Sequence, residues 1–304
     1  MMDCADEYFG THPDVREALT VLRPGVRQGA AAMCSYESIP LPTVKHYPAS
    51  EPLSAAAVQE QCERALASAG VEGWCVVVDT PGSRVSFNTN HALKTIFVPS
   101  DTDLRLRTFP LTRERVDAII AHEIGTHVVR RVRGEASPLA LLGVGLAGYL
   151  RGEEGVATYA EQVRDGTRHF AGGLGYLAIG WARGLDGTPR TFRGLHTMLV
   201  AYFLVAALEH AIHYGEAVDV ERCREHAEHR AWARCVRTFR GTSGTTPGAC
   251  FTKDIVYREG NMAIWELATR DPAWVSHFFL GKYDPTKEEH VALLSELGMI
   301  THAH

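Results

Sequence analysis

The sequence contains no C-x-x-C pair, and its seven cysteines are an odd number without regular spacing. We therefore expect neither a cysteine zinc site nor a disulfide framework, and this usage suits a reducing cytosol. The first residues are acidic and lack the basic-then-apolar run of a signal peptide, which predicts a cytoplasmic protein. The apolar stretches 138–150 and 197–208 each have about a dozen residues, fewer than the ~18–20 that a bilayer requires, so no membrane partner is expected.

Lysine is also scarce, with five residues against 26 arginines. A net charge of −5 gives no reason to expect nucleic acid as a partner. The excess of arginine, beside abundant alanine and glycine, suggests a GC-rich bacterial genome. The hydrophobic fraction of 45% is ordinary for a globular protein, and 304 residues suffice for one large domain or two small ones.

The segment 121–127, Ala-His-Glu-Ile-Gly-Thr-His, lies within a pattern that predicts a helix from Thr112 to about Arg130. A buried stripe recurs there at three- and four-residue steps: Val116, Ile119, Ile120, Glu123, Ile124, His127 and Val128. Ionisable groups in such a stripe are costly unless a partner satisfies them. His122 and His127 are five positions apart, near enough to one helix face to direct both imidazoles to one point.

We interpret this segment as the H-E-x-x-H signature of zinc hydrolases, in which two histidines bind Zn²⁺ and the glutamate is the general base. The alternative is a pair of surface histidines on a polar helix, and the apolar stripe argues against it. Glu153 and Glu154, 26 and 27 positions after His127, are the candidates for a third ligand. They could equally be two acids favoured at a helix N-terminus.

The rest of the chain suggests an α+β fold. Residues 1–50 read as an N-terminal segment with a helix at 13–22, and residues 51–304 as the catalytic domain. Strands at 74–79, 85–88 and 93–98 predict a small antiparallel sheet, which with the active-site helix occupies 71–131. A helical lobe follows over 152–304, with helices expected at 192–214, 218–237, 253–270, 272–280 and 285–297. Another helix, capped by Ser54, precedes the sheet.

Three ordered blocks resemble the family that contains the microtubule-associated tyrosine carboxypeptidases and many bacterial relatives. The sequence HEIGTH followed by EEGVA is similar to the family's HEIGTH and (Q/E)EGLA. Arg240-Gly241 followed by 247–257 resembles R-G…P-G-C-F-(S/T)-K-D-x-V-Y, and Leu280-Gly281-Lys282 matches as well. The resemblance covers about residues 110–300. Val156 replaces the usual leucine and Ala249 is an extra residue, but neither is a proposed ligand.

The resemblance implies a zincin-like fold of the gluzincin type, a small sheet packed on the H-E-x-x-H helix. It implies one zinc ion per chain, held by His122, His127 and Glu154, with Glu123 as the catalytic carboxylate. No other cofactor is expected. A carboxypeptidase must also neutralise the free carboxylate of its substrate, for which arginine or lysine is suited. The candidates lie around the third block, although each could be an ordinary surface group: Arg240, Lys253 and Arg258, with Tyr257 assisting.

The predicted function is therefore a zinc metallocarboxypeptidase that removes an aromatic, tyrosine-like residue from the C-terminus of a peptide or protein. In a bacterium it could trim a peptide precursor in a biosynthetic pathway. One alternative is a zinc endopeptidase or aminopeptidase on the same scaffold. Another is a non-catalytic zinc-stabilised protein that binds peptides, although a purely structural site would not need Glu123 as a base. The oligomeric state cannot be read from the sequence.

Overall fold

A computed structural model of the chain describes residues 11–22, 51–83, 86–105, 111–166, 170–214 and 217–300. It contains two compact units: unit 1 comprises Met1–Ser38 and Gly172–Ile255, and unit 2 comprises Ile39–Ala171 and Val256–His304. The predicted helical lobe 152–304 is shared between these two units. Helices dominate the described residues, and one small sheet accompanies them in unit 2, in agreement with an α+β fold.

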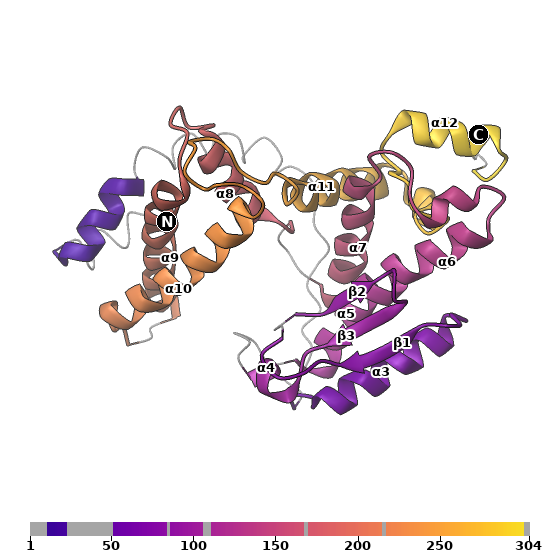
Figure 1. The fold of residues 1–304 in the computed structure, drawn as a ribbon, viewed down its shortest axis with the longest axis horizontal. Helices are drawn as coiled ribbons and strands as arrows, with labels where there is room; N and C mark the ends of the chain where they lie inside the picture. Colours follow the sequence, from indigo (N-terminus) through magenta and orange to yellow (C-terminus); the bar gives the residue numbers. More distant parts are fainter. Residues whose placement is uncertain are drawn as a thin grey trace. The chain divides into compact units, whose positions relative to one another are not determined.

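The sheet consists of β1 (Cys75–Val78), β2 (Asn88–Asn90) and β3 (Thr95–Val98) in the order β1-β3-β2 (Figure 1). β2 and β3 pair antiparallel, as predicted, but β1 and β3 pair parallel, so the sheet is mixed and the prediction of an all-antiparallel sheet was wrong for β1. The short turn at 91–94 makes β2 and β3 a hairpin. The third strand therefore lies in the centre and runs in the same direction as β1.

One face of this sheet is covered by helices. The first, α3 (Ala55–Ser68), begins where Ser54 accepts a hydrogen bond from the N–H of Ala57, the cap expected from the sequence. The next, α5 (Arg113–His122), begins in the same way at Thr112, close to the predicted start. Their apolar faces share a core with the central strand, built from Val58, Cys62, Leu66, Ile96, Val98, Val116 and Ile119.

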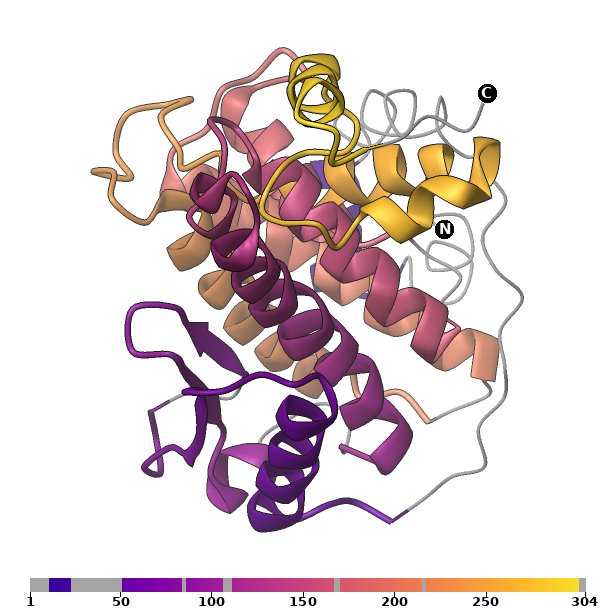
Figure 2. The same cartoon turned by 90° about the vertical axis from the view of Figure 1, so that its right-hand side faces the viewer.

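The chain continues from α5 through a π-helical turn, η1 (Glu123–Val128), into α6 (Val129–Ala136). The three segments form one uninterrupted helical rod (Figure 2). α7 (Leu150–Asp165) packs against α5 and η1. The other elements of unit 2 are α4 (Asp101–Arg105), η2 (Ala140–Gly143), α11 (Ile255–Arg270), which begins at the last residue of unit 1, η3 (Pro272–His277) and α12 (Glu288–Glu296). The segment expected as a helix at 272–280 is thus a short 3₁₀ helix.

Unit 1 is helical in its described part. It contains a helix at 13–22, α8 (Gly173–Arg183), α9 (Phe192–Tyr214) and α10 (Val220–Phe239), and the last two pack side by side. Its core is formed by apolar residues of all four helices. By length and composition alone, Phe192–Ile212 could cross a membrane, although the sequence stretch had been expected to be too short. Half of its apolar window is buried inside unit 1.

Candidate metal centre

Three side chains of unit 2 bring potential metal ligands together. His122 is the last residue of α5, His127 lies in η1, and Glu154 lies near the start of α7. One ligand atom from each residue lies within 4.8 Å of the other two. Among the described residues, these three form the cluster that could hold a metal ion. Nε2 of His122 is 3.9 Å from Oε2 of Glu154, and Nε2 of His127 is 3.8 Å from the same oxygen.

The π-helical turn explains how His122 and His127 meet. The segment is H-E-x-x-x-H, one residue longer than the H-E-x-x-H signature with which we compared it. In an α-helix, residues five apart point about 140° away from each other, since each residue advances by about 100°. In η1 the hydrogen bonds instead span five residues, as from the N–H of Val129 to the carbonyl of Ile124. The extra residue is absorbed, and the two imidazole rings lie 5.0 Å apart.

Each histidine is oriented by a carboxylate on its other nitrogen. Nδ1 of His122 lies 2.9 Å from Glu161, and Nδ1 of His127 lies 2.9 Å from Glu153. In a neutral imidazole, a hydrogen bond to a carboxylate keeps the proton on Nδ1 and leaves the lone pair of Nε2 for a metal ion. Both lone pairs are thus available on the side of Glu154.

These two carboxylates are themselves held by cations. Arg115 donates to Glu161 at 2.6 Å and to Asp165 at 2.7 Å. Arg130, which is fully buried, donates to Glu153 at 2.5 Å. The ammonium of Lys282 lies 3.3 Å from the same carboxylate. The histidines are therefore positioned by carboxylates of α7, and these carboxylates are held by cations of α5, α6 and the segment after η3.

The network shifts the pKa values of its members. Burial alone would lower the pKa of His122, but its hydrogen bond with Glu161 and the charge of Glu123 outweigh burial and raise the pKa to about 9. Burial alone would raise the pKa of Glu153, but Arg130, His127 and Lys282 hold it well below its usual range. The carboxylates around His122 thus favour a positive charge at that position.

The donor set fits zinc. Two imidazole nitrogens and one carboxylate oxygen are ligands that Zn²⁺ takes, and three protein ligands leave a fourth position for water. Ligands about 2.1 Å from a tetrahedral zinc lie about 3.4 Å apart. The separations of 3.8 and 3.9 Å to Glu154 are within half an ångström of that distance. The carboxylate partners of both histidines match the arrangement common at such centres.

Glu123 lies beside this cluster without belonging to it. It follows His122 directly and begins η1. Its Oε2 accepts a hydrogen bond of 2.5 Å from the hydroxyl of Thr89 on β2. A carboxylate fixed in this way next to three metal ligands is placed to exchange a proton with a water at the site.

The residues predicted to bind the substrate carboxylate are divided between the two units. Arg240 and Lys253 belong to unit 1, and Tyr257 and Arg258 belong to unit 2. Arg240 pairs with Asp254 at 3.2 Å and lies over the ring of Phe251, and it shares that carboxylate with Arg234 and Arg237. Lys253 is exposed. Arg258 lies over the ring of Phe170, and Tyr257 is partly buried.

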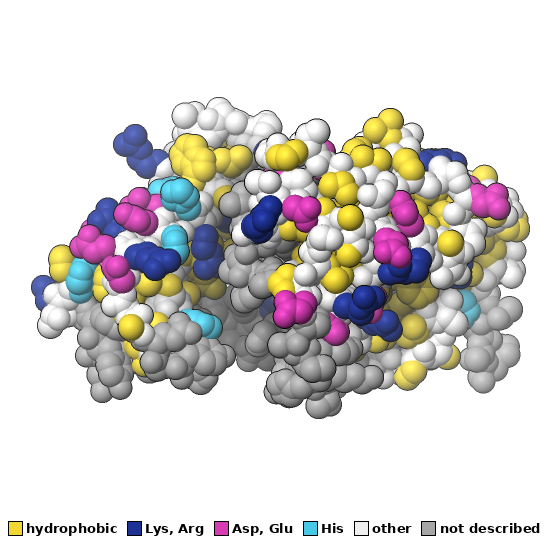
Figure 3. Space-filling model, turned by 90° about the horizontal axis from the view of Figure 1, so that it is seen from below, with side chains coloured by type: hydrophobic (Ala, Val, Ile, Leu, Met, Phe, Trp, Pro, Cys, Tyr) yellow, Lys and Arg dark blue, Asp and Glu magenta, His cyan; other side chains and the backbone are white. Residues whose placement is uncertain are grey.

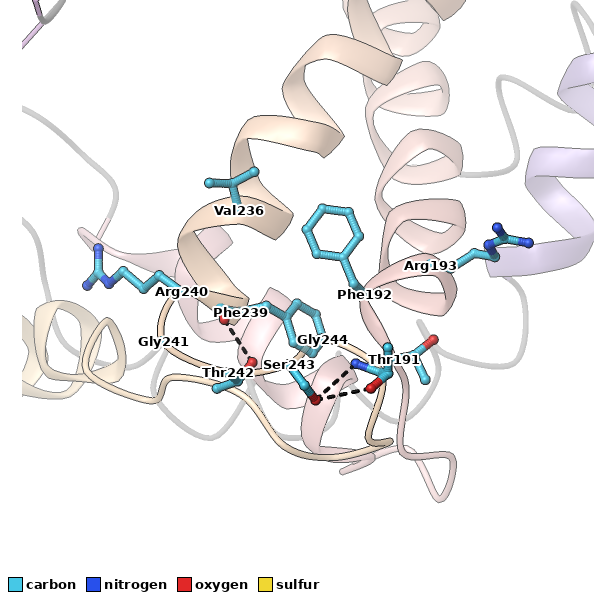
Figure 4. Close-up of a pocket in the computed structure, with 11 residues that line it drawn as sticks. Thr191, Phe192, Arg193, Val236, Phe239, Arg240, Gly241, Thr242, Ser243 and Gly244 are labelled. Atoms are coloured by element: carbon cyan, nitrogen blue, oxygen red, sulfur yellow. Dashed lines mark hydrogen bonds between the residues drawn. The ribbon is translucent and has the colours of Figure 1, made fainter.

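Arg240 also borders an open pocket of unit 1 (Figure 4). The pocket lies between the start of α9 and the end of α10, and the loop after α10 borders it. Apolar side chains and hydroxyl groups both line it, and the full lining is Thr191, Phe192, Arg193, Val236, Phe239 and 240–245. None of these residues belongs to the metal cluster.

Sequence reasoning missed several residues of the centre. Glu161 lies seven positions after Glu154, which places both on one face of α7. Arg130 lies three positions after His127, on the same side of the rod. These spacings were the available signals. Thr89 lies 34 positions before Glu123, so no local spacing could have indicated their contact.

The chain matches the model of a known protein family. The family model described as "Microtubule-associated tyrosine carboxypeptidase" matches residues 2–169 and 211–304, which is most of the chain. Every residue of the metal cluster and its carboxylate partners falls within the matched ranges. No curated protein matches the chain.

Proposed function

The chain belongs to the microtubule-associated tyrosine carboxypeptidase family, a family of peptidases, and from this premise we propose that it is a zinc-dependent carboxypeptidase. The observation that carries the proposal is the convergence of His122, His127 and Glu154, with Glu123 beside them. We further propose that unit 2, with its sheet, π-interrupted helix and third ligand on the next long helix, is a zincin-like domain of the gluzincin type.

In this proposal His122, His127 and Glu154 hold one zinc ion. When bound, the ion supplies a Lewis acid that lowers the pKa of a water molecule and polarises the substrate carbonyl. The carboxylate of Glu123 accepts a proton from the attacking water. After the C–N bond breaks, Glu123 donates that proton to the leaving amine, and the base is restored. Glu161 and Glu153 keep the imidazoles oriented throughout.

The free carboxylate of the substrate requires a cation. Of the predicted candidates we favour Lys253 for that role, because its side chain is exposed, while Arg240 already shares Asp254 with two other arginines. Arg258 and Tyr257 are further candidates. The removed residue is proposed to be aromatic and tyrosine-like, following the description of the family.

We propose a peptide or protein C-terminus as the partner rather than nucleic acid or a membrane. The net charge is −5, and the face in Figure 3 intersperses acidic and basic side chains among its described residues, so it offers no field of one sign. A cytoplasmic location is proposed because the five described cysteines are all free thiols. In a bacterium, a peptide precursor is the proposed substrate.

The test is mass spectrometry of peptides incubated with the enzyme, with and without a chelator. One peptide ends in a free tyrosine, a second is its C-terminal amide, and a third ends in alanine. The proposal expects loss of one residue from the first peptide alone, abolished by the chelator and by Glu123→Gln. Equal cleavage of the amide would favour an endopeptidase or an aminopeptidase. Cleavage unaffected by the chelator would contradict the proposal.

A further inference from the structure

β2 is the edge strand of the sheet and reaches the metal centre. Among the strands in the described part of the chain it pairs only with β3, with Thr89 opposite Ile96. Directly opposite residues of an antiparallel pair point to the same face, so Thr89 points to the face on which Ile96 is buried against the helices. Its β-branched side chain suits a strand. Its hydroxyl can reach a side chain of η1.

The hydroxyl of Thr89 donates to Oε2 of Glu123 at 2.5 Å. An ionised carboxylate can only accept, so the direction of this hydrogen bond is fixed. Hydrogen bonds from a hydroxyl to a charged oxygen are shorter and stronger than neutral ones, and both groups here are partly shielded from water. Within the described part of the chain, the other oxygen of Glu123 accepts no hydrogen bond from protein.

We propose that Thr89 is a positioning residue for the reaction: it holds one oxygen of Glu123 so that the other faces the attacking water. This inference rests on the proposed function, in which Glu123 is the general base. The geometric reason is that a glutamate has three rotatable bonds, and a base gains efficiency when it is held at hydrogen-bond distance from the proton it takes. Main-chain packing of η1 fixes the Cα of Glu123, whereas Thr89 fixes its carboxylate.

The kinetic test compares Thr89→Val, which removes the donor at nearly constant shape, with Thr89→Ser, which keeps it. Thr89→Val should lower kcat about tenfold or more and leave KM within about twofold, since ground-state binding of the peptide is untouched. Thr89→Ser should recover most of kcat. The matched control is Thr95→Val on β3, whose hydroxyl donates to the carbonyl of Leu93 and should leave kcat unchanged. Zinc affinity should be the same in all variants, because Thr89 touches no ligand.

A second measurement does not depend on activity. Urea unfolding of the metal-free protein is compared for wild type, Thr89→Val, Glu123→Ala and the double variant. If the hydrogen bond is formed, Thr89→Val lowers the unfolding midpoint while Glu123 is present and leaves it unchanged once Glu123 is alanine. A role of Thr89 in strand packing alone would lower the midpoint equally in both backgrounds.

The outcomes separate this inference from the proposed function. A wild-type protein that cleaves no peptide would contradict the proposed function. The dependence of the Thr89→Val midpoint shift on Glu123 in urea unfolding would still show whether the two side chains are in contact. An active enzyme in which Thr89→Val keeps its kcat, or in which Thr89→Ser is as slow as Thr89→Val, would overturn the positioning role. Equal midpoint shifts in both backgrounds would overturn it as well.

Discussion

At the scale of single residues, the metal centre depends on carboxylates that do not touch the metal. Glu161 meets Nδ1 of His122 and is held in turn by Arg115. Such partners fix the orientation of an imidazole and raise its basicity as a ligand. Replacing such a partner lowers the affinity for the metal ion even though every ligand remains.

We expect Glu161→Gln to weaken zinc binding about 10- to 100-fold, because a neutral amide orients His122 less firmly. Competition with a chromophoric chelator measures this directly. Asp165→Asn is the matched control, since it changes a carboxylate that pairs with the same Arg115, at 2.7 Å. Unchanged affinity in Glu161→Gln would mean that this carboxylate does not support the site.

Arg130 supports the site through Glu153, the carboxylate partner of His127. Its side chain has no exposed surface, and it donates to Glu153 and to the carbonyl of Tyr283 at 2.5 Å each. We expect Arg130→Met to destabilise the metal-free protein by about 3–5 kcal/mol, since it leaves the buried Glu153 without its main partner. Chemical unfolding measures the loss. Arg133→Met, at an exposed position of the same helix, should cost less than about 0.5 kcal/mol.

The sequence indicated part of this residue-scale picture. His122, His127 and Glu154 were identified from a motif and a family block, and the structure brings their ligand atoms together. Zinc binding itself stays a prediction. The supporting residues were not identified, because the meaning of Glu161 or Arg130 depends on which helix packs against which. Glu153 was weighed as a ligand, but its place behind His127 is set by Arg130 and Lys282, and the latter is 129 positions away.

At the scale of elements, the π-helical turn was not predicted, although the five-residue spacing of His122 and His127 in the sequence was its signal. The apolar periodicity of 112–130 predicted a helix correctly, but a stripe counted at three and four residues cannot reveal one extra residue per turn. Helix starts were predicted well where a side chain caps the helix, as at Ser54 and Thr112. The order of the strands in the sheet was not predicted, because strand register and the choice of neighbouring strand depend on tertiary packing.

Two glycines of unit 2 test the packing of these elements with opposite expected signs. A Cβ at Gly260 of α11 would overlap the carbonyl oxygen of Arg151 on α7, so Gly260→Ala should destabilise the protein by about 1–3 kcal/mol. A Cβ at Gly125 of η1 meets only ordinary contact distances, so Gly125→Ala should stabilise by about 0.5–1 kcal/mol. Thermal unfolding of the metal-free variants compares the two. A stable Gly260→Ala protein would mean that α7 and α11 do not cross this closely.

At the scale of the whole molecule, the proposed chemistry lies in one of two units. All the ligands, their carboxylate partners and Glu123 belong to unit 2. The stretch that the family model leaves unmatched, residues 170–210, falls almost wholly in unit 1 and includes α8 and most of α9. The sequence suggested one catalytic domain from residue 51 onward, since nothing in its composition marks residues 172–255 as a separate unit.

The central claim is that the two histidines and Glu154 bind one zinc ion in each chain. Elemental analysis of the purified wild type, Glu154→Ala and Glu123→Gln tests it most directly. The account predicts one zinc per chain in the wild type and in Glu123→Gln, and less than about a tenth of that in Glu154→Ala, because a lost ligand removes affinity while a lost base does not. A full complement of zinc in Glu154→Ala, or none in the wild type after growth with zinc, would contradict it.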